Sequence, residues 1–272
     1  MHEEPQQRMP VVFVSHGAPT LAIEDNDAHR FLRTFGIELG RPRGILVVSA
    51  HFEAPVATVT AAESPQTIHD FGGFPRELYE MTYPAPGSPE LAGEVLELLA
   101  QAGVPTRAAA SRGLDHGAWI PLSLMYPQAD IPVVQVSIDP RRGSRYHHEL
   151  GRHLAPLRGD GVLIMGSGGV THNLRELAWD GRHAGTPQWA AAFNEWVAEA
   201  TAAGRIDDLL AYRDLAPHAA RNHPTEEHFF PLLCALGAVS EDEHRARVHH
   251  SYTMGALSMD TYQFGNCPGQ TQ

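Results

Sequence analysis

The chain has 272 residues, of which 43% are hydrophobic and 19% are charged, and its formal net charge is −12. This composition supports a packed core and excludes a largely disordered chain, and the acidic balance makes nucleic acid a poor partner. No apolar run has the length of a membrane span and the acidic N-terminus has no signal-peptide pattern, so we expect a cytoplasmic protein without a membrane partner.

Short apolar runs alternate with helical patterns along the chain. The strands that we predict cover residues 10–15, 44–51, 131–138, 161–167, 245–252 and 255–264. The helices that we predict cover residues 27–37, 89–102, 119–126, 145–157, 187–203, 206–214 and 225–236. This alternation predicts one α/β domain over residues 1–272, with a central, largely parallel or mixed sheet and helices on both faces.

Two histidines follow predicted strands near the start of the chain. His16 comes directly after the run PVVFVS, and His51 follows the run GILVVSA. Ligands of α/β proteins bind beyond the carboxyl ends of the strands, and neighbouring strands lie roughly 5 Å apart. Imidazole is the commonest side-chain metal ligand, so both rings can reach one metal ion if the two strands are neighbours.

Residues 62–88 do not fit the alternation. The segment AESPQTIHDFGGFPRELYEMTYPAPGS is rich in proline, glycine and aromatic residues, and it is long for a loop. Loops of this length usually form lids or binding walls. We therefore expect His69, within this segment, to contact a substrate.

Two further histidines lie in short polar motifs. His116, in LDHGAW, precedes a predicted helix, and Asp115 either orients its ring or caps the helix and leaves His116 at the surface. His172 follows the glycine-rich stretch GSGG after a predicted strand. It is the best candidate for an acid/base, and it can also serve as a fourth metal ligand.

The fifth histidine lies in HPTEEHFFPLL, where Pro224 and the two glutamates suit the first turn of a helix. His228 is a candidate third metal ligand. Glu227 either competes for the metal or orients the His228 ring. The alternative interpretation of this motif is a helix start that carries one surface histidine.

The chain contains no lysine, because all 20 basic residues are arginine. A phosphate-binding P-loop, a Schiff-base lysine, a kinase-type lysine and Ser-Lys catalysis are therefore excluded.

Together, these motifs resemble the class III extradiol ring-cleavage dioxygenases, and in particular their 4,5-DOPA dioxygenase-like branch. The matching stretches are SHGAP, VVSAHF, IHDFGGFP, YPAPGSP, LDHGAW, IPVVQVSID, GSGGVTHNL, HPTEEHFFPLL and MGALSMDTYQFG. They occur in this order over nearly the whole chain, so the resemblance is specific although each stretch alone is weak.

The resemblance implies one non-haem metal held by His16, His51 and His228. It implies that His172 acts as acid/base beside the metal, where it is sometimes counted as a fourth ligand, and that His116 faces the substrate as a second catalytic histidine. The implied reaction is the O₂-dependent ring opening of a small aromatic diol, a DOPA-like catechol, to a semialdehyde. Candidate pocket walls around the substrate are Phe71, Phe74, Tyr79 and Trp119.

The third ligand position leaves the metal open. Familiar extradiol enzymes hold Fe(II) with two histidines and one carboxylate, whereas this sequence offers His228 with Glu227 beside it. We expect Fe(II) for catalysis, but an all-histidine set also suits Zn(II). Two alternatives therefore stay open: a zinc-dependent hydrolase on the same fold, and a non-enzymatic metal-binding protein. The sequence settles neither the particular catechol nor the oligomeric state.

Overall fold

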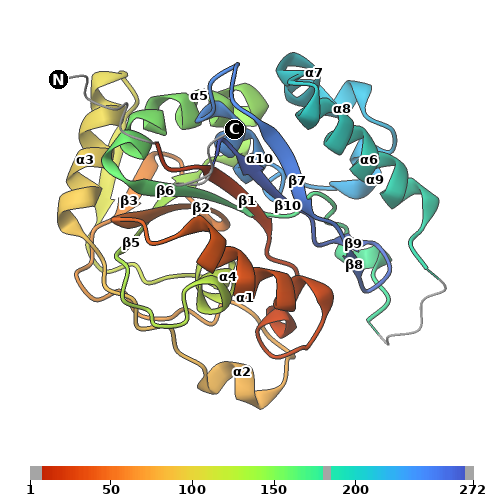
Figure 1. The fold of residues 1–272 in the computed structure, drawn as a ribbon, viewed down its shortest axis with the longest axis horizontal. Helices are drawn as coiled ribbons and strands as arrows, with labels where there is room; N and C mark the ends of the chain where they lie inside the picture. The colour runs from red at the N-terminus through yellow and green to blue at the C-terminus, as the bar shows by residue number, and fades with distance from the viewer. Residues whose placement is uncertain (1–7, 180–184, 267–272) are drawn as a thin grey trace.

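A computed structural model describes residues 8–179 and 185–266 of the chain (Figure 1). Eight strands of the described chain form one sheet in the order β4-β3-β5-β2-β6-β1-β10-β7. Their bounds are β1 (Val11–Ser15), β2 (Gly44–Glu53), β3 (Ala57–Thr60), β4 (Thr106–Ala109), β5 (Val133–Ile138), β6 (Val162–Gly168), β7 (Arg245–His249) and β10 (Thr261–Phe264). A separate hairpin pairs β8 (Tyr252–Thr253) with β9 (Leu257–Ser258).

The centre of the sheet is parallel and its flanks are mixed. Strands β5, β2, β6 and β1 run in the same direction, whereas β3 pairs antiparallel with β5 and β10 pairs antiparallel with β1. In the register of the central strands, Ser15 lies opposite Gly168 and Ser49 lies opposite Ser167. The carboxyl ends of β1, β2 and β6 therefore meet at one edge of the sheet.

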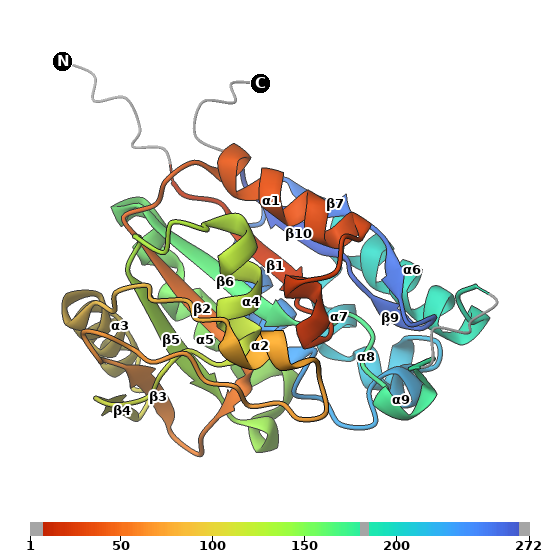
Figure 2. The same ribbon diagram turned by 90° about the horizontal axis from the view of Figure 1, so that it is seen from below.

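Helices cover both faces of the sheet. One face carries α1 (Asp27–Leu39) and α4 (His116–Met125), on the near side in Figure 2. The other face carries α3 (Pro89–Gln101), α5 (Gly143–Leu154) and α10 (Phe230–Gly237). A group of helices beyond β7 and β10 comprises α6 (Gln188–Ala202), α7 (Ile206–Leu210), α8 (Tyr212–Leu215) and α9 (Ala219–Asn222) (Figure 1).

The two hydrophobic cores follow from the period of two in a strand. Along β1, the side chains of Val11 and Phe13 enter the core under α3, α5 and α10, and those of Val12 and Val14 enter the core under α1 and α4. A strand buried on both faces must be apolar at every position, which explains the unbroken run VVFV.

Several predicted boundaries need correction. The helix predicted over 225–236 begins only at Phe230, because residues 224–229 form turns and Pro231 occupies the first helical turn, where a missing N–H costs nothing. The helix predicted from 119 begins at His116. The strand predicted over 255–264 is broken into β9 and β10, and the helix predicted over 206–214 into α7 and α8.

The sequence prediction also missed short elements. Strands β3 and β4 are four residues long, and α9 and α2 (Arg76–Glu80) have four and five residues. Elements this short carry too few periodic positions to be recognised. Helix α2 lies inside the segment 62–88, which otherwise has the irregular structure expected for it.

Candidate active site

Five histidines lie together at the carboxyl edge of the parallel strands. His16 follows β1 and His51 lies near the end of β2. His116 is the first residue of α4, His172 lies four residues beyond β6, and His228 lies in the turn before α10. All five line one cavity of about 370 Å³.

A close approach of backbone to backbone brings His228 to this edge. The amide of Gly169 donates to the carbonyl oxygen of His228 at 2.9 Å. A Cβ atom on Gly168 would lie 2.2 Å from that same oxygen, so only glycine permits the contact. The glycine-rich stretch at the end of β6 therefore seats the turn that carries His228.

The Nε2 atoms of three histidines converge. His51 Nε2 lies 3.1 Å from His16 Nε2 and 3.3 Å from His228 Nε2. Metal–nitrogen bonds of about 2.0–2.1 Å place two ligand atoms of one ion roughly 3 to 3.4 Å apart. Both measured distances therefore fit one shared metal ion, and one ligand atom from each of the three histidines lies within 4.8 Å of the other two.

The hydrogen bonds on the far side of two rings fix where their protons lie. The Ser167 hydroxyl donates to the carbonyl oxygen of Gly117, so its oxygen accepts from His16 Nδ1–H at 3.0 Å. His228 Nδ1–H donates to Glu227 Oε1 at 3.0 Å. The Nε2 atoms of His16 and His228 therefore carry no hydrogen, and their lone pairs point at His51. A cation between the rings would stabilise this arrangement. In metal centres, a hydrogen bond at the other ring nitrogen commonly holds each histidine ligand in one tautomer.

Burial keeps these rings neutral. Loss of water around the rings, reinforced by the neighbouring histidines, lowers the pKa of His16 and of His228 well below the ordinary value. The same cause lowers the pKa of His51 to about 4 and that of His172 to about 3. Because a metal binds only neutral imidazole, the folded chain presents the ligands in the required form near neutral pH.

The other two histidines of the cluster lie against these three. The His172 ring stacks on the His228 ring, with centroids 3.3 Å apart and an angle of 8° between the planes. The His116 ring centroid lies 3.9 Å from that of His51. Both are placed to touch a molecule bound at the three convergent nitrogens.

The cavity wall is largely apolar. Its apolar lining consists of Ala18, Pro19, Phe71, Phe74, Leu174, Leu177, Trp179 and Leu257. The leucines and Trp179 were missed in the sequence because single apolar residues in loops resemble ordinary core positions. Phe71 and Phe74 line the cavity as expected, and their rings meet edge to face at 5.6 Å.

His69, Tyr79 and Trp119 are not among the lining residues, which differs from the direct contact expected of them. Trp119 is fully buried and donates its indole N–H to the carbonyl oxygen of Ile68 at 3.0 Å. His69 Nε2 donates to the carbonyl oxygen of Met81 at 3.0 Å. Both rings therefore brace the loop behind Phe71 instead of facing the cavity.

The carboxylate beside His116 is Asp70 and not Asp115. Asp70 Oδ1 accepts from the backbone N–H of His116 at 3.0 Å and lies 2.8 Å from its Nδ1. Hydrogen bonds from His116 overcome the opposing effect of burial and hold the pKa of Asp70 at about 2. A carboxylate next to His69 in an irregular loop was the available sequence signal, but nothing in the sequence pairs it with His116.

Asp115 has a different task. It is fully buried, caps α4 through the amide of Ala118 at 3.2 Å, and accepts from Ser49 at 2.6 Å and Gln135 at 2.6 Å. Arg112 bonds both to Asp115 and to the carbonyl oxygen of His51. The helix-cap interpretation of Asp115 is thus correct, whereas the surface position considered with it for His116 is wrong, since that residue is only 6% exposed.

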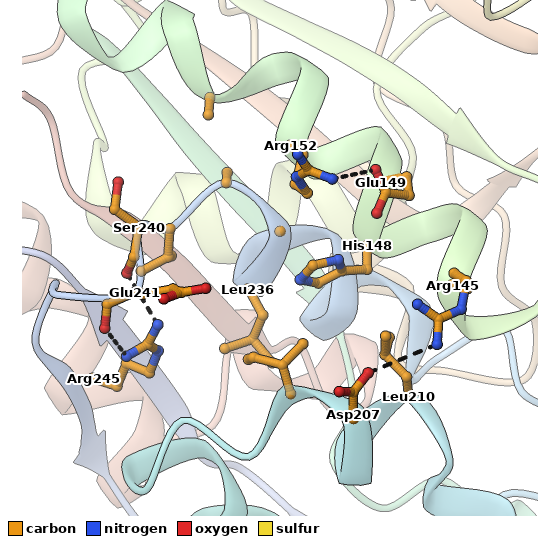
Figure 3. A pocket seen from close by; sticks show the side chains of 15 residues that line it. Arg145, His148, Glu149, Arg152, Asp207, Leu210, Leu236, Ser240, Glu241 and Arg245 are labelled. Atoms are coloured by element: carbon orange, nitrogen blue, oxygen red, sulfur yellow. Dashed lines mark hydrogen bonds and ion pairs between the residues drawn. The ribbon is translucent and has the colours of Figure 1, made fainter.

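A larger cavity of about 490 Å³ lies elsewhere, between α5, α7, α10 and β7 (Figure 3). Its charged side chains are largely engaged with other groups of the protein: Arg152 with Glu149 at 2.8 Å, Arg145 with Asp207 at 3.7 Å, and Arg245 with the carbonyl oxygens of Ser240 and Glu241. It contains none of the five clustered histidines. Size alone therefore does not identify the site, and the smaller cavity holds the chemistry.

Comparisons with known proteins point to one family. The family model of the catalytic LigB subunit of aromatic ring-opening dioxygenases matches residues 10–264. A 4,5-DOPA dioxygenase extradiol of Escherichia coli (strain K12) is 46% identical over 261 residues, covering 95% of each chain. One of Beta vulgaris is 42% identical over 258 residues, covering 93% of this chain and 95% of the relative.

A solved structure agrees with the fold. The crystal structure of an uncharacterized protein from Escherichia coli K12 superposes with a TM-score of 0.81 at 40% identity, covering 95% of this chain and 100% of the other.

In the described residues, no helix combines the length and the apolar composition that crossing a membrane requires.

Proposed function

This chain belongs to the LigB family of aromatic ring-opening dioxygenases, and from that premise we propose that it opens the ring of a DOPA-like catechol with O₂. Extradiol ring cleavage of catechols is the activity that the family and the relatives named 4,5-DOPA dioxygenase extradiol support. The preference for a DOPA-like substrate is our proposal, as are a single catalytic domain over residues 1–272 and a cytoplasmic location.

The observation that carries the proposal is the convergence of three Nε2 atoms, with His51 Nε2 3.1 Å from that of His16 and 3.3 Å from that of His228, among the lining residues of a cavity whose wall is largely apolar. We assign the metal to His16, His51 and His228, with Glu227 orienting His228 rather than binding. Fe(II) is the proposed working metal, since oxygenases with open coordination positions use it. Held by these residues, the metal would act as a Lewis acid toward the diol and would supply the redox chemistry that O₂ activation needs.

The remaining residues handle protons and exclude water. We assign to His172 the removal of a proton from a catechol hydroxyl, because it is a neutral imidazole beside the three ligands. His116 is assigned the return of a proton to the opened product. Phe71, Phe74 and Leu257 line the space in which the ring would lie, and a water-poor wall of this kind limits side reactions.

A reconstitution experiment tests the proposed function. The purified protein is loaded anaerobically with Fe(II), mixed with L-DOPA, dopamine or dihydroxyphenylacetate, and then exposed to O₂. We expect O₂ uptake and a yellow semialdehyde with at least one catechol, and neither in a zinc-loaded control. Ester hydrolysis by the zinc form, without ring opening by the iron form, would instead support the hydrolase alternative.

A variant tests the role of His172. His172→Ala is expected to keep most of its metal and to lose ring cleavage by 100-fold or more, as expected when a general base is removed. Loss of the metal together with the activity would mean that His172 is a ligand. Full activity would show that it is neither ligand nor base.

A further inference from the structure

Asp70 makes a two-point contact with His116. One carboxylate oxygen, Oδ1, accepts from the backbone N–H at 3.0 Å and lies 2.8 Å from ring Nδ1. The other oxygen lies 4.0 Å from Nδ1 of His51. Asp70 precedes His116 by 46 residues, so the contact is made by the fold and not by local chain geometry.

The chemistry of this contact fixes the His116 proton. An ionised carboxylate can only accept hydrogen bonds, so Nδ1 of His116 must be the nitrogen that carries hydrogen. In the neutral ring, Nε2 then carries the lone pair. The ring cannot turn freely to exchange the two nitrogens, because it lies edge to face with Phe71 at 5.7 Å and against His51 at 3.9 Å.

The loop that carries Asp70 is built into the fold. Ile68 N donates to the carbonyl oxygen of Leu114 at 2.8 Å, and Leu114 N donates to that of Gln66 at 2.8 Å. The bond from Trp119 to the Ile68 carbonyl and the bond from His69 to Met81 hold the backbone on either side. These contacts explain why two aromatic rings expected to touch substrate instead stand behind the loop.

We propose that Asp70 is a positioning residue, which holds His116 in the Nδ1–H tautomer with its Nε2 lone pair available to the bound catechol. This rests on the proposed function. A proton of a catechol hydroxyl would pass to His116 Nε2 as the O–H bond breaks and an N–H bond forms. The ionised Asp70 would stabilise the resulting imidazolium, and the same proton would later return to the opened product. His116 can thus hold a proton between the two steps, alongside His172.

The tautomer is measured directly. Protein labelled with ¹⁵N in histidine is loaded with diamagnetic Zn(II), and the His116 imidazole signals are assigned by their loss in His116→Asn. We expect the wild-type ring to carry hydrogen on Nδ1. Both contacts of His116 are made with the same oxygen, Oδ1, so in Asp70→Asn the amide oxygen can replace it and we expect the hydrogen to stay on Nδ1. In Asp70→Ala no acceptor remains, so we expect hydrogen to appear on Nε2 as well.

The iron-loaded variants give the kinetic test. Asp70→Ala is expected to lose about 100-fold in kcat, within the range that proton transfer supplies, with KM changed less than about threefold and metal content unchanged. Asp70→Asn keeps the acceptor oxygen and loses only the charge, so we expect a smaller loss in kcat. Glu77→Gln, an exposed carboxylate of the same segment, is the matched control and is expected to behave as wild type.

Three results would overturn the inference. One is a wild-type His116 ring with hydrogen on Nε2, which is decisive even if both Asp70 variants fail to fold. The second is wild-type kcat in Asp70→Ala. The third is lost kcat in Asp70→Ala with the tautomer unchanged. A wild-type protein that shows the expected tautomer but cleaves no catechol would count against the proposed function and leave the pairing of Asp70 with His116 in place.

Discussion

Strand β1 ends at the histidine cluster and begins beside a buried arginine. At its carboxyl end, two histidine lone pairs face a third ring nitrogen at 3.1 and 3.3 Å. At its amino end, Arg158 is 1% exposed and donates through Nε to the carbonyl oxygen of Met9 at 2.7 Å. The same guanidinium donates to the Ala238 carbonyl at 2.8 Å and to both carboxylate oxygens of Glu243.

The two ends differ in whether the chain completes its own hydrogen bonds. Arg158 has an acceptor from the chain at each of its nitrogens, so its burial ties the start of β1 to the segment before β6. The convergent Nε2 atoms of His16, His51 and His228 carry lone pairs that can accept hydrogen bonds, but too few N–H groups face them to donate to every lone pair. Buried polar groups are normally satisfied, and this unmatched set of nitrogens lies at the edge of the sheet where α/β proteins bind ligands. The buried arginine at one end of β1 therefore stabilises the fold, whereas the buried histidines at the other end are placed to bind a ligand.

The largest expected effect is at the carboxyl end. His16→Ala removes one of three proposed ligands, so we expect loss of essentially all bound metal and of ring cleavage, measured by elemental analysis and O₂ uptake. The unfolding free energy of the metal-free protein should fall little, because crowding among the imidazoles is relieved. His153→Ala, a histidine of α5 outside the cluster, is the control. A variant that keeps stoichiometric metal would contradict the ligand assignment.

At the amino end of β1, we expect a substitution to lower the unfolding free energy without changing metal content or activity. Glu243→Gln leaves a buried guanidinium without its counter-charge, and breaking such a pair costs about 3 kcal/mol of unfolding free energy. Metal content and kcat at low temperature should stay at wild-type levels. Urea denaturation measures the loss, with Glu94→Gln as the control, because the more exposed Arg43–Glu94 pair is worth less than about 1 kcal/mol. An equal loss in both variants would remove the distinction between buried and exposed pairs.

A smaller effect is expected where a hydrogen bond serves the metal. Ser167→Ala removes the acceptor that holds His16 Nδ1–H, and the loss of such a partner weakens metal binding by about tenfold. Competition with a chelator measures the affinity. Ser123→Ala, which loses only a bond to the carbonyl oxygen of Ile120, should leave the affinity unchanged. Equal affinities in the two variants would mean that Ser167 does not orient the ligand.

The sequence predicted the carboxyl end of the sheet better than the amino end. His16 and His51 follow apolar runs, and the rule that α/β sites gather beyond parallel strands brings them together without any structure. The central strands and the long helices were found for the same reason, because each carries many periodic positions. Arg158 has no such signal: an arginine in a polar stretch is usually exposed, and its burial depends on Glu243, 85 residues away.

Long-range partners account for the errors within the site. Asp115 lies beside His116 in the sequence, yet the ring pairs with Asp70, because a helix cap uses the neighbouring carboxylate for backbone amides. Trp119 was expected at the substrate but is turned inward by the helical phase of α4, which begins three residues earlier than predicted. The order of residues along the chain does not specify which of two carboxylates reaches a given ring.

The smallest expected effect is a dependence on pH at the amino end. Partial burial opposes ionisation of Glu243, but hydrogen bonds from Arg158 outweigh it, and the charge of Arg8 adds to them, so the pKa of the carboxyl lies below its ordinary value of 4.5. The pair therefore contributes its full stability above about pH 4.5. Below that pH the unfolded chain takes up a proton more readily than the folded chain, and the contribution is lost as pH falls through the folded pKa.

The gap in unfolding free energy between wild type and Glu243→Gln should thus be constant from pH 7 to 5 and shrink below 4.5. Urea denaturation in the presence of EDTA measures it, and taking the difference between two proteins with the same histidines cancels the titration of the cluster. A gap that does not shrink would show that the carboxylate charge is not what distinguishes this end of β1.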